Sequence, residues 1–422
     1  MTKSSNAYRF YVLILLMLTY LLSFMDRQIL SILIEDIGKD FTLNDTQRGV
    51  LMGLAFSLFY AALGIPVAWL ADRANRKNII AAAVTFWSIA TALCGLASGF
   101  WSLFAARVGV GIGEAGGTPP AHSILGDYFK KSELTRALSV YSIGPALGAT
   151  LGLIAGGWLA ETYGWRAAFV IVGLPGIFLG IIVYFTVQEP ERGKFAAEEA
   201  NPIAAQGLWA SFKSLCRQPA YIGALAGHTL QYTSGFILMS WAAVIMIRTF
   251  NASLSEVGVL LGLALLFGSP PGMIIGGFLS DKLAYRDARW MAWIPAIAML
   301  LTMPFYLGSM FAPNIESMAV MIGLGAFFIG ISYAPNIGII QTLVQPSQRA
   351  LASAFLLLTA NIIGMGFGPF LSGWLSDILR PVYQTASINM AVAVCQIFFI
   401  PAALAFVWTS FKLKDHSIRD AS

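Results

Sequence analysis

Long apolar segments alternate with short polar ones along almost the whole chain. A helix rises about 1.5 Å per residue, so about 20 residues cross the hydrocarbon core of a bilayer, which is about 30 Å thick. Segments of about this length run through residues 10–34, 47–71, 79–97, 101–125, 135–160, 166–187, 219–247, 255–281, 290–310, 315–343, 349–376 and 387–411. The pattern therefore predicts an all-α membrane protein with twelve transmembrane helices.

The longest polar interval divides these helices into two sets of six. We predict a first half over residues 1–187, a cytoplasmic linker over 188–218, and a second half with a cytoplasmic tail over 219–422. One short phrase recurs where predicted helices 2, 5, 8 and 11 end, as Ala-Trp-Leu-Ala-Asp (68–72), Gly-Trp-Leu-Ala-Glu (157–161), Gly-Phe-Leu-Ser-Asp (277–281) and Gly-Trp-Leu-Ser-Asp (373–377). The halves are therefore pseudo-symmetric repeats, each with two inverted three-helix units, as in one large class of secondary transporters.

The composition agrees with a membrane protein, since 57% of the residues are apolar and only 11% are charged, against about 25% charged residues in soluble domains. Most Lys and Arg residues fall in loops on one side, which places both termini in the cytoplasm of a bacterial inner membrane or a plasma membrane. The basic residues expected on the other side are Lys39, Arg48, Arg166, Arg248 and Arg380. The three cysteines are scattered, so we expect no metal site and no cofactor.

Four ionisable residues of the first half fall inside predicted helices, namely Asp26, Arg27, Arg107 and Glu114. The apolar run Phe10–Phe24 is too short to span a bilayer, so the first helix must continue past Asp26 and Arg27. A charge at bilayer depth costs at least a few kcal/mol and persists mainly beside a partner or a cavity. From the helical rise, Asp26 and Arg107 lie at a similar depth and can pair, whereas Glu114 lies near the middle.

The two carboxylates are candidates for proton coupling. Surroundings of low dielectric constant favour a protonated carboxyl group, and a nearby arginine favours the ionised form. We therefore predict that Asp26 and Glu114 take up and release protons, and that Arg107 sets the pKa of both carboxyl groups. Permanent ion pairs that only hold helices together are the alternative.

The predicted helices of the second half carry neutral polar groups where the first half carries charges. The possible cavity-lining residues there are His228, Gln231, Tyr232, Asn336 and Asn361. A single buried histidine is more often a hydrogen-bonded structural residue than a ligand. A cavity between two such halves would be charged on one side and apolar on the other, which suits an amphipathic substrate.

Three motifs resemble those of the major facilitator superfamily. The segment Ala68–Lys77 is similar to the superfamily's loop motif between helices 2 and 3, although Ala68 and Asn75 stand where glycine is usual. The helix-4 and helix-5 motifs are matched by Arg107-x-x-x-Gly111-x-Gly113 and Gly144-Pro145-x-x-Gly148. This resemblance implies the major facilitator fold of twelve helices in two halves.

The superfamily resemblance also implies a cytoplasmic gate, formed by Asp72, Arg73, Arg76 and Lys77. The alternative is that these charges only set the topology of the chain. Small residues spaced four apart let helices cross closely, and two glycine ladders have this spacing: Gly144, Gly148, Gly152 and Gly156, and Gly268, Gly272 and Gly276. The resemblance places the helices that carry them, the fifth and the eighth, against each other between the halves.

Within the superfamily, the segments Phe24–Gln28, Asp72–Lys77, Phe86–Ser88 and Gly111–Ala115 together resemble the Spinster family. This resemblance implies that Asp26 and Glu114 serve proton coupling and that Arg27 and Arg107 serve substrate binding or coupling. It also implies substrates that are lysophospholipids or sphingolipid-like molecules.

The sequence thus favours a proton-coupled secondary active transporter that works by alternating access on an amphipathic, lipid-like substrate. An organic-anion or sugar-acid:proton symporter is the alternative, and a channel would not need two repeated halves with buried acids. The sequence has no Walker A phosphate loop, catalytic Ser/His/Asp set or HExxH run, so we expect neither an ATP-driven pump nor an enzyme. The expected partners are the substrate, protons and the lipid bilayer, without nucleic acid, and a monomer is expected.

Overall fold

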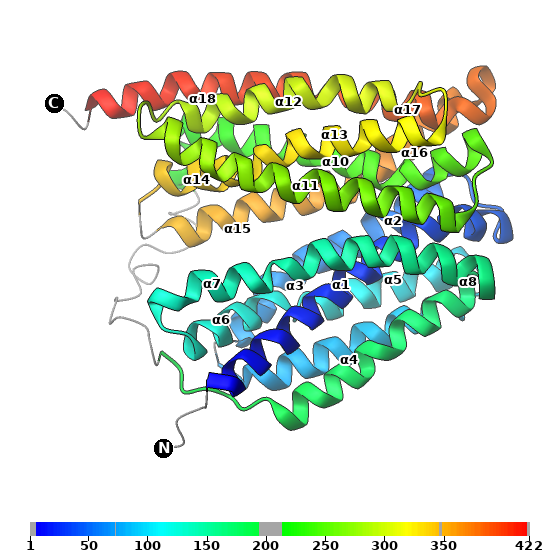
Figure 1. Cartoon of the computed structure of the whole chain (residues 1–422), viewed down its shortest axis with the longest axis horizontal. Helices are drawn as coiled ribbons and strands as arrows, with labels where there is room; N and C mark the ends of the chain where they lie inside the picture. Colours follow the sequence, from blue (N-terminus) through cyan, green and yellow to red (C-terminus); the bar gives the residue numbers. More distant parts are fainter. Residues whose placement is uncertain (1–5, 72, 194–212, 346–347, 420–422) are drawn as a thin grey trace. The chain divides into compact units, whose positions relative to one another are not determined.

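The computed structural model describes residues 6–71, 73–193, 213–345 and 348–419, and this part of the chain is helical without a β-strand. Two compact units are present (Figure 1). Unit 1 comprises Met1–Glu199 and Asn251–Gly262, and unit 2 comprises Ala200–Phe250 and Leu263–Ser422.

Unit 1 contains six long helical passes, of which three are interrupted. Its helices are α1 (Asn6–Asp40), α2 (Asp45–Met52), α3 (Leu54–Ala71), α4 (Arg76–Cys94), α5 (Phe100–Glu114), α6 (Thr118–Tyr128), α7 (Lys131–Tyr141) and α8 (Ile143–Thr186). Helices α1 and α4 both pack along α8. A sharp bend at Gly164, whose φ is 81°, divides α8 into two passes, because glycine has no Cβ that would forbid this conformation.

Unit 2 repeats this arrangement with more interruptions. Its helices are α10 (Pro219–Phe250), α11 (Leu254–Ala284), α12 (Trp290–Ser309), α13 (Ile315–Ile331), α14 (Tyr333–Leu343), α15 (Arg349–Thr359), the π-helix η3 (Ala360–Phe367), α16 (Gly368–Tyr383), the short 3₁₀ turn η4 (Gln384–Ala386), α17 (Ser387–Cys395), the short 3₁₀ turn η5 (Gln396–Phe398) and α18 (Phe399–Arg419). Only the first turns of α11, up to Gly262, belong to unit 1. Helix α10 packs on α18 and η3, and α12 packs on α13 and α18.

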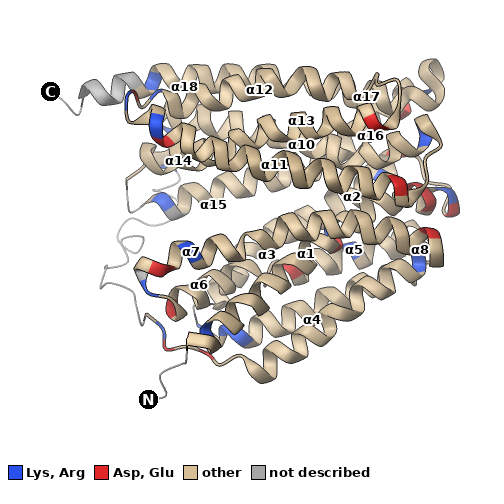
Figure 2. Cartoon of the chain, in the orientation of Figure 1, with Lys and Arg blue, Asp and Glu red and all other residues tan. Residues whose placement is uncertain are grey.

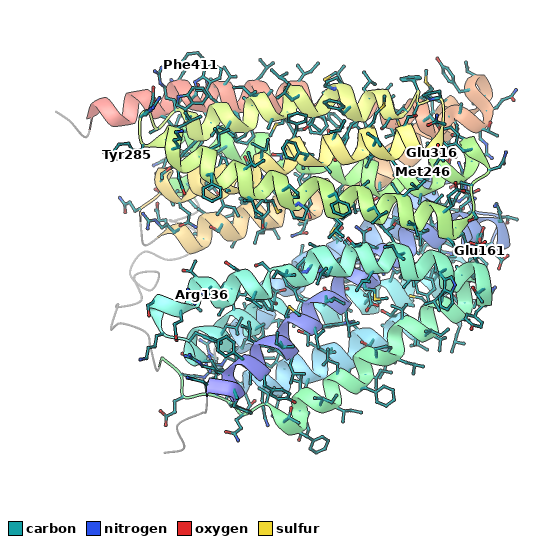
Figure 3. The ribbon with its side chains drawn as sticks, in the orientation of Figure 1. Arg136, Glu161, Met246, Tyr285, Glu316 and Phe411 are labelled. Atoms are coloured by element: carbon teal, nitrogen blue, oxygen red, sulfur yellow. The ribbon has the colours of Figure 1, made fainter. Side chains whose placement is uncertain are left out.

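The helical passes match the predicted membrane segments closely. Eight stretches of the described chain are long and apolar enough to cross a membrane, and two of these, Ser132–Thr186 and Leu351–Leu413, each hold two predicted helices. The passes from α2 to α3 and from α5 to α6 are the interrupted ones that this measure leaves out. Charged residues gather near helix ends and connections in Figure 2. Large apolar side chains such as Phe411, labelled in Figure 3, are exposed, as expected of helices that face lipid.

The glycine ladders pack helices within each unit. A Cβ atom on Gly148 would meet the backbone oxygen of Leu21 in α1, and one on Gly276 would meet the backbone oxygen of Ile331 in α13. The expectation that the ladder residues form the crossing of predicted helices 5 and 8 is therefore wrong, although α8 does approach the first turns of α11 closely, at Gly157 and Gly258. A ladder marks a close crossing, but its spacing does not say which helix is crossed.

Candidate functional site

A buried ion pair between α1 and α5 lies at the centre of the site. Glu114 Oε2 accepts hydrogen bonds from Arg27 Nε at 2.7 Å and from Ser23 Oγ at 2.8 Å. Arg27 Nη2 lies 2.7 Å from the same oxygen, which makes the contact bidentate on the guanidinium side. The side chain of Glu114 is 0% exposed and that of Arg27 12%, so the attraction between them is little screened by water.

Three aromatic rings surround the Arg27 guanidinium. Its central carbon lies 4.8 Å from the ring centres of Phe24 and Phe56 and 4.7 Å from that of Tyr60. The faces of aromatic rings attract cations at these distances. The rings therefore stabilise the charged guanidinium from several sides, in addition to its ion pair with Glu114.

Asp26 lies on the adjacent face of α1 and has a different partner. Its Oδ2 accepts a hydrogen bond from Thr91 Oγ1 at 3.1 Å. The predicted pairing of Asp26 with Arg107 is not an ion pair in the part of the chain that the structure describes: Arg107 Nη1 donates to the backbone oxygen of Asp26 at 3.4 Å. One residue along a helix turns the side chain by about 100°, so Asp26 and Arg27 point to different neighbours.

Glycine residues and a helix interruption position these groups. Glu114 is the last residue of α5, and the chain does not resume a helix until Thr118. A Cβ on Gly111 would lie 2.5 Å from the backbone oxygen of Phe56, and one on Gly113 would lie 2.7 Å from Trp87 Cβ. The helix-4 motif thus lets α5 approach both α3 and α4 closely enough to bury Glu114 and Arg107 between them.

Several polar atoms of this cluster have no hydrogen-bond partner among the described residues. They are Asp26 Oδ1, Glu114 Oε1, Arg107 Nε and Trp87 Nε1. Buried polar atoms usually have partners, and an unpaired one is costly. Two carboxylates that each keep one unpaired oxygen are chemically able to hold a proton or to accept one from a donor.

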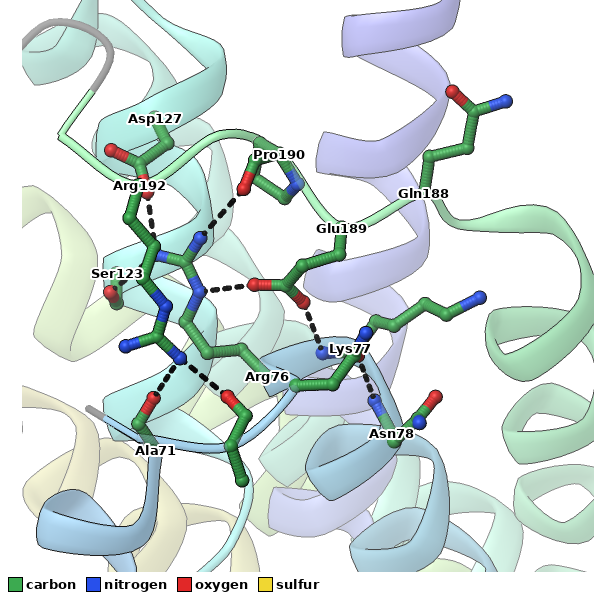
Figure 4. Close-up of polar contacts among 12 residues, drawn as sticks. Ala71, Arg76, Lys77, Asn78, Ser123, Asp127, Gln188, Glu189, Pro190 and Arg192 are labelled. Carbon is green, nitrogen blue, oxygen red and sulfur yellow. Dashed lines mark hydrogen bonds and ion pairs between the residues drawn. The ribbon is translucent and has the colours of Figure 1, made fainter.

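A second network lies where α3 and α4 meet, beside the segment that follows α8 (Figure 4). Arg76 Nε lies 2.6 Å from Glu189 Oε1, and Arg76 Nη1 lies 2.5 Å from Asp127 Oδ2. Glu189 Oε2 also accepts from the Lys77 backbone N–H at 3.0 Å. Arg192 Nη2 donates to the backbone oxygens of Ala71 and Ala74. The network joins the ends of α3, α4 and α6 to the segment after α8.

The predicted gate residues therefore divide into two groups. Arg76 and Lys77 belong to the network, whereas Arg73 donates to the Trp69 backbone oxygen at 3.2 Å and stacks over its ring. Asp72 lies outside the described residues. Asp127, Glu189 and Arg192 were missed, although the run Glu189-Pro190-Glu191-Arg192 directly after an apolar segment was a visible signal.

A third buried charge cluster lies at the opposite end of α1 and was also missed. Arg48 Nη1 lies 2.7 Å from Asp45 Oδ1, and Arg48 Nη2 lies 3.8 Å from Glu35 Oε2. These three residues are at most 6% exposed, so Arg48, one of the basic residues expected on the side opposite the termini, is buried in an ion-pair cluster of α1 and α2. Arg48 can be buried against α1 because Gly38 has no side chain, and a Cβ on Gly38 would collide with the Arg48 guanidinium.

Unit 2 brings together three of its five predicted polar residues. Asn336 Nδ2 donates to Gln231 Oε1 at 2.7 Å and lies 3.2 Å from His228 Nδ1. The Tyr232 ring centre lies 6.1 Å from that of His228. Asn361 is separate, because its Nδ2 donates to the Leu357 backbone oxygen at 2.8 Å in the same helical run. Of the residues that the structure describes in unit 2, no Asp, Glu, Lys or Arg is buried.

Comparisons with known proteins agree with this arrangement. The model of the Major Facilitator Superfamily matches residues 16–362 and, in a second match, 225–419. A curated "MFS-type efflux pump" of Mycolicibacterium smegmatis (strain ATCC 700084 / mc(2)155) is 38% identical over 361 residues, which cover 85% of this chain and 82% of the relative. The "Sphingosine-1-phosphate transporter SPNS2" of Danio rerio is 26% identical over 418 residues, covering 93% of this chain and 82% of the relative.

A solved structure gives the most direct comparison. It is the crystal structure of a bacterial homologue of the human lysosomal transporter Spinster in an inward-facing and unoccupied conformation. Its sequence is 30% identical to this chain, the match covers 97% of this chain and 98% of that one, and the TM-score is 0.88. The chain therefore belongs to the major facilitator superfamily, in its Spinster-like group, and it is a multi-pass membrane transporter and not an enzyme.

Proposed function

We propose that this transporter is proton-coupled, works by alternating access, and carries a single-chain amphipathic lipid with an anionic or zwitterionic head group. One observation carries the proposal: Arg27 and Glu114 form an ion pair beside the buried Asp26, and each of the two carboxyl groups keeps one oxygen without a partner among the described residues. Every buried charged residue that the structure describes belongs to the same unit.

The coupling follows from competition for Arg27. An ionised Glu114 occupies the guanidinium and neutralises it. A proton on Glu114 removes that negative charge and leaves Arg27 between its three rings, ready for another anion. An anionic head group is such a partner, so the binding of a proton and the binding of substrate become linked. Asp26 is a second proton site, and Thr91 stabilises its ionised form.

The lipid part of the proposal is supported by the charge difference between the units and by a relative. The residues buried in the described part of unit 2 are apolar or neutral, and burial of a lipid chain among apolar groups contributes up to about 0.8 kcal/mol per methylene. The Danio rerio relative is named as a transporter of sphingosine-1-phosphate, which combines an anionic head with one long chain.

An organic-anion or sugar-acid:proton symporter is the second candidate, because the neutral groups His228, Gln231 and Asn336 can also bind sugar hydroxyls. A binding series on the protein in lipid nanodiscs distinguishes the two. Lysophosphatidic acids of increasing chain length should bind with rising affinity, and Arg27→Ala should weaken all of them.

Arg73→Ala is the matched control, since Arg73 stacks on Trp69 and lies outside the site. Saturable binding of glucuronate, with no response to any single-chain lipid, would favour the second candidate.

A further inference from the structure

We infer that the cluster of His228, Gln231 and Asn336 in unit 2 is a binding subsite for a hydroxyl group of the substrate. The inference rests on the proposed function, because it assigns to these three residues the recognition of an uncharged polar group of the substrate. The cluster lies between α10, which carries His228 and Gln231, and α14, which carries Asn336.

The hydrogen bonds in the cluster have a definite direction. Ser332 Oγ donates to the Ile329 backbone oxygen at 2.6 Å, so it accepts from Gln231 Nε2. That orientation turns Gln231 Oε1 toward Asn336 Nδ2, at 2.7 Å. The second hydrogen of the Asn336 amide points to His228 Nδ1, at 3.2 Å. Each of these side chains therefore fixes the orientation of the next.

The same chain of bonds assigns the tautomer of His228. Its Nδ1 accepts a hydrogen bond from an amide, so the proton of a neutral imidazole must be on Nε2. That N–H is a donor with no acceptor among the described residues. His228 is only partly buried, unlike Gln231 and Asn336. Its Nε2–H is therefore the donor that the cluster presents.

The cluster also presents one acceptor. Asn336 is 1% exposed, yet its Oδ1 has no hydrogen-bond partner in the part of the chain that the structure describes. A buried oxygen without a partner costs about 1–3 kcal/mol. This cost is recovered when a hydrogen-bond donor reaches Asn336 Oδ1. We therefore assign that oxygen to a donor group of the substrate.

One unused donor and one unused acceptor define the ligand chemistry. A hydroxyl group can donate to Asn336 Oδ1 and accept from His228 Nε2. A carboxylate or phosphate is excluded, because no buried cation is described in unit 2 and Asn336 Oδ1 would repel it. The subsite therefore takes an uncharged hydroxyl, such as that of a glycerol backbone.

Aromatic rings and a helix interruption lie next to the cluster. The rings of Tyr232 and Phe236 follow His228 along α10, with centres 5.4 Å apart and nearly parallel. Helix α13 ends at Ile331, Ser332 separates it from α14, and α14 begins at Tyr333 with Pro335 in its first turn. Proline has no N–H, and the interruption lets Ser332 and Asn336 both face α10.

The test compares two lipids that differ in a single hydroxyl group. The probes are oleoyl lysophosphatidic acid and its 2-deoxy analogue, bound to the full chain in nanodiscs. Wild-type protein should bind the hydroxylated lipid about fivefold to tenfold more tightly. Asn336→Leu should reduce this ratio to about one by weakening only the hydroxylated lipid, and His228→Phe should reduce it partly.

Asn361→Leu is the matched control, since Asn361 bonds only within its own helical run and the ratio should persist. Equal affinities of the wild-type protein for both lipids would overturn the subsite, even if the Asn336 variant does not fold. Equal weakening of both lipids by Asn336→Leu would assign the cluster a structural role.

A glucuronate arm separates the two proposals. If glucuronate binds and the lipids do not, the lipid proposal fails, whereas loss of glucuronate binding in Asn336→Leu still supports a hydroxyl subsite. Glucuronate binding that is independent of Asn336, or binding of none of the three probes, would overturn both.

Discussion

The two units have similar helical frameworks and opposite interiors. Each contains a glycine ladder that brings two helices into backbone contact. Unit 1 buries charged residues at three levels, represented by Arg48, Arg107 and Arg76, whereas the buried polar residues described in unit 2 are all neutral. A common framework can therefore hold two kinds of chemistry: charge exchange in one unit and directional hydrogen bonding in the other.

The loops that follow the first long hairpin of each unit show the same contrast. In unit 1, Arg76 contacts Asp127 and Glu189, which are far away in the sequence. In unit 2, Arg289 contacts Asp287, two residues away, and both side chains are over a third exposed. The Arg76 contacts thus tie distant segments together in unit 1, whereas the Arg289–Asp287 pair of unit 2 joins residues two positions apart.

The largest effect should come from removing the carboxylates of unit 1. Glu114→Gln cannot lose a proton and no longer neutralises Arg27, so pH-gradient-driven transport should be abolished while the protein stays folded. Asp26→Asn should act in the same direction. Flux measured in proteoliposomes with and without a pH gradient tests this. Glu316→Gln, at an exposed carboxylate of unit 2, should have no effect, and unchanged gradient-driven flux in both unit 1 variants would refute the coupling role.

The next effect compares the two loops. Arg76→Ala leaves Asp127 and Glu189 close together without a cation, and should lower the free energy of unfolding by about 2–4 kcal/mol. Arg289→Ala removes a partly exposed local pair, and should cost less than about 1 kcal/mol. Thermal unfolding in detergent measures both. Similar costs for the two variants would show that the loops do not differ in this way.

A smaller effect should separate neighbouring glycines of α11. A Cβ on Gly276 would collide with backbone of α13, whereas a Cβ on Gly277 would meet nothing within 4 Å. Gly276→Ala should therefore destabilise unit 2 by about 1–3 kcal/mol, and Gly277→Ala should be neutral or slightly stabilising. Gly148→Ala should reproduce the loss in unit 1. Equal melting temperatures for the two α11 variants would show that α11 and α13 can move apart to accommodate an added methyl group.

The smallest effect concerns Thr91. Its hydroxyl donates to Asp26 and favours the ionised carboxylate, so Thr91→Val should move the midpoint of the pH profile of transport upward by less than about one pH unit. Thr85→Val is the control on the same helix, because Thr85 donates to the Ala81 backbone oxygen. A shift of equal size in the control would assign the change to helix α4 in general.

The sequence alone determined the helices and the two halves, and it predicts the depth of the ionisable residues along them. These properties follow from hydropathy, segment length and a fixed rise per residue, which are local or additive. The same arithmetic placed Asp26, Arg27, Arg107 and Glu114 within the first half. In the structure Asp26, Arg107 and Glu114 are buried there, and the partly buried Arg27 pairs with Glu114.

Only the tertiary structure decided which of these groups are partners. Similar depth alone allowed Asp26 to pair with Arg107. The rotation of α1 instead points Arg27 at Glu114, with which it forms an ion pair, and Asp26 at Thr91, from which it accepts a hydrogen bond. The contact of Arg76 with Glu189 joins segments 113 residues apart in the chain. Such contacts depend on how each helix is rotated about its axis and on where helices cross. Side-chain direction turns by about 100° from one residue to the next, and glycines allow the close crossings.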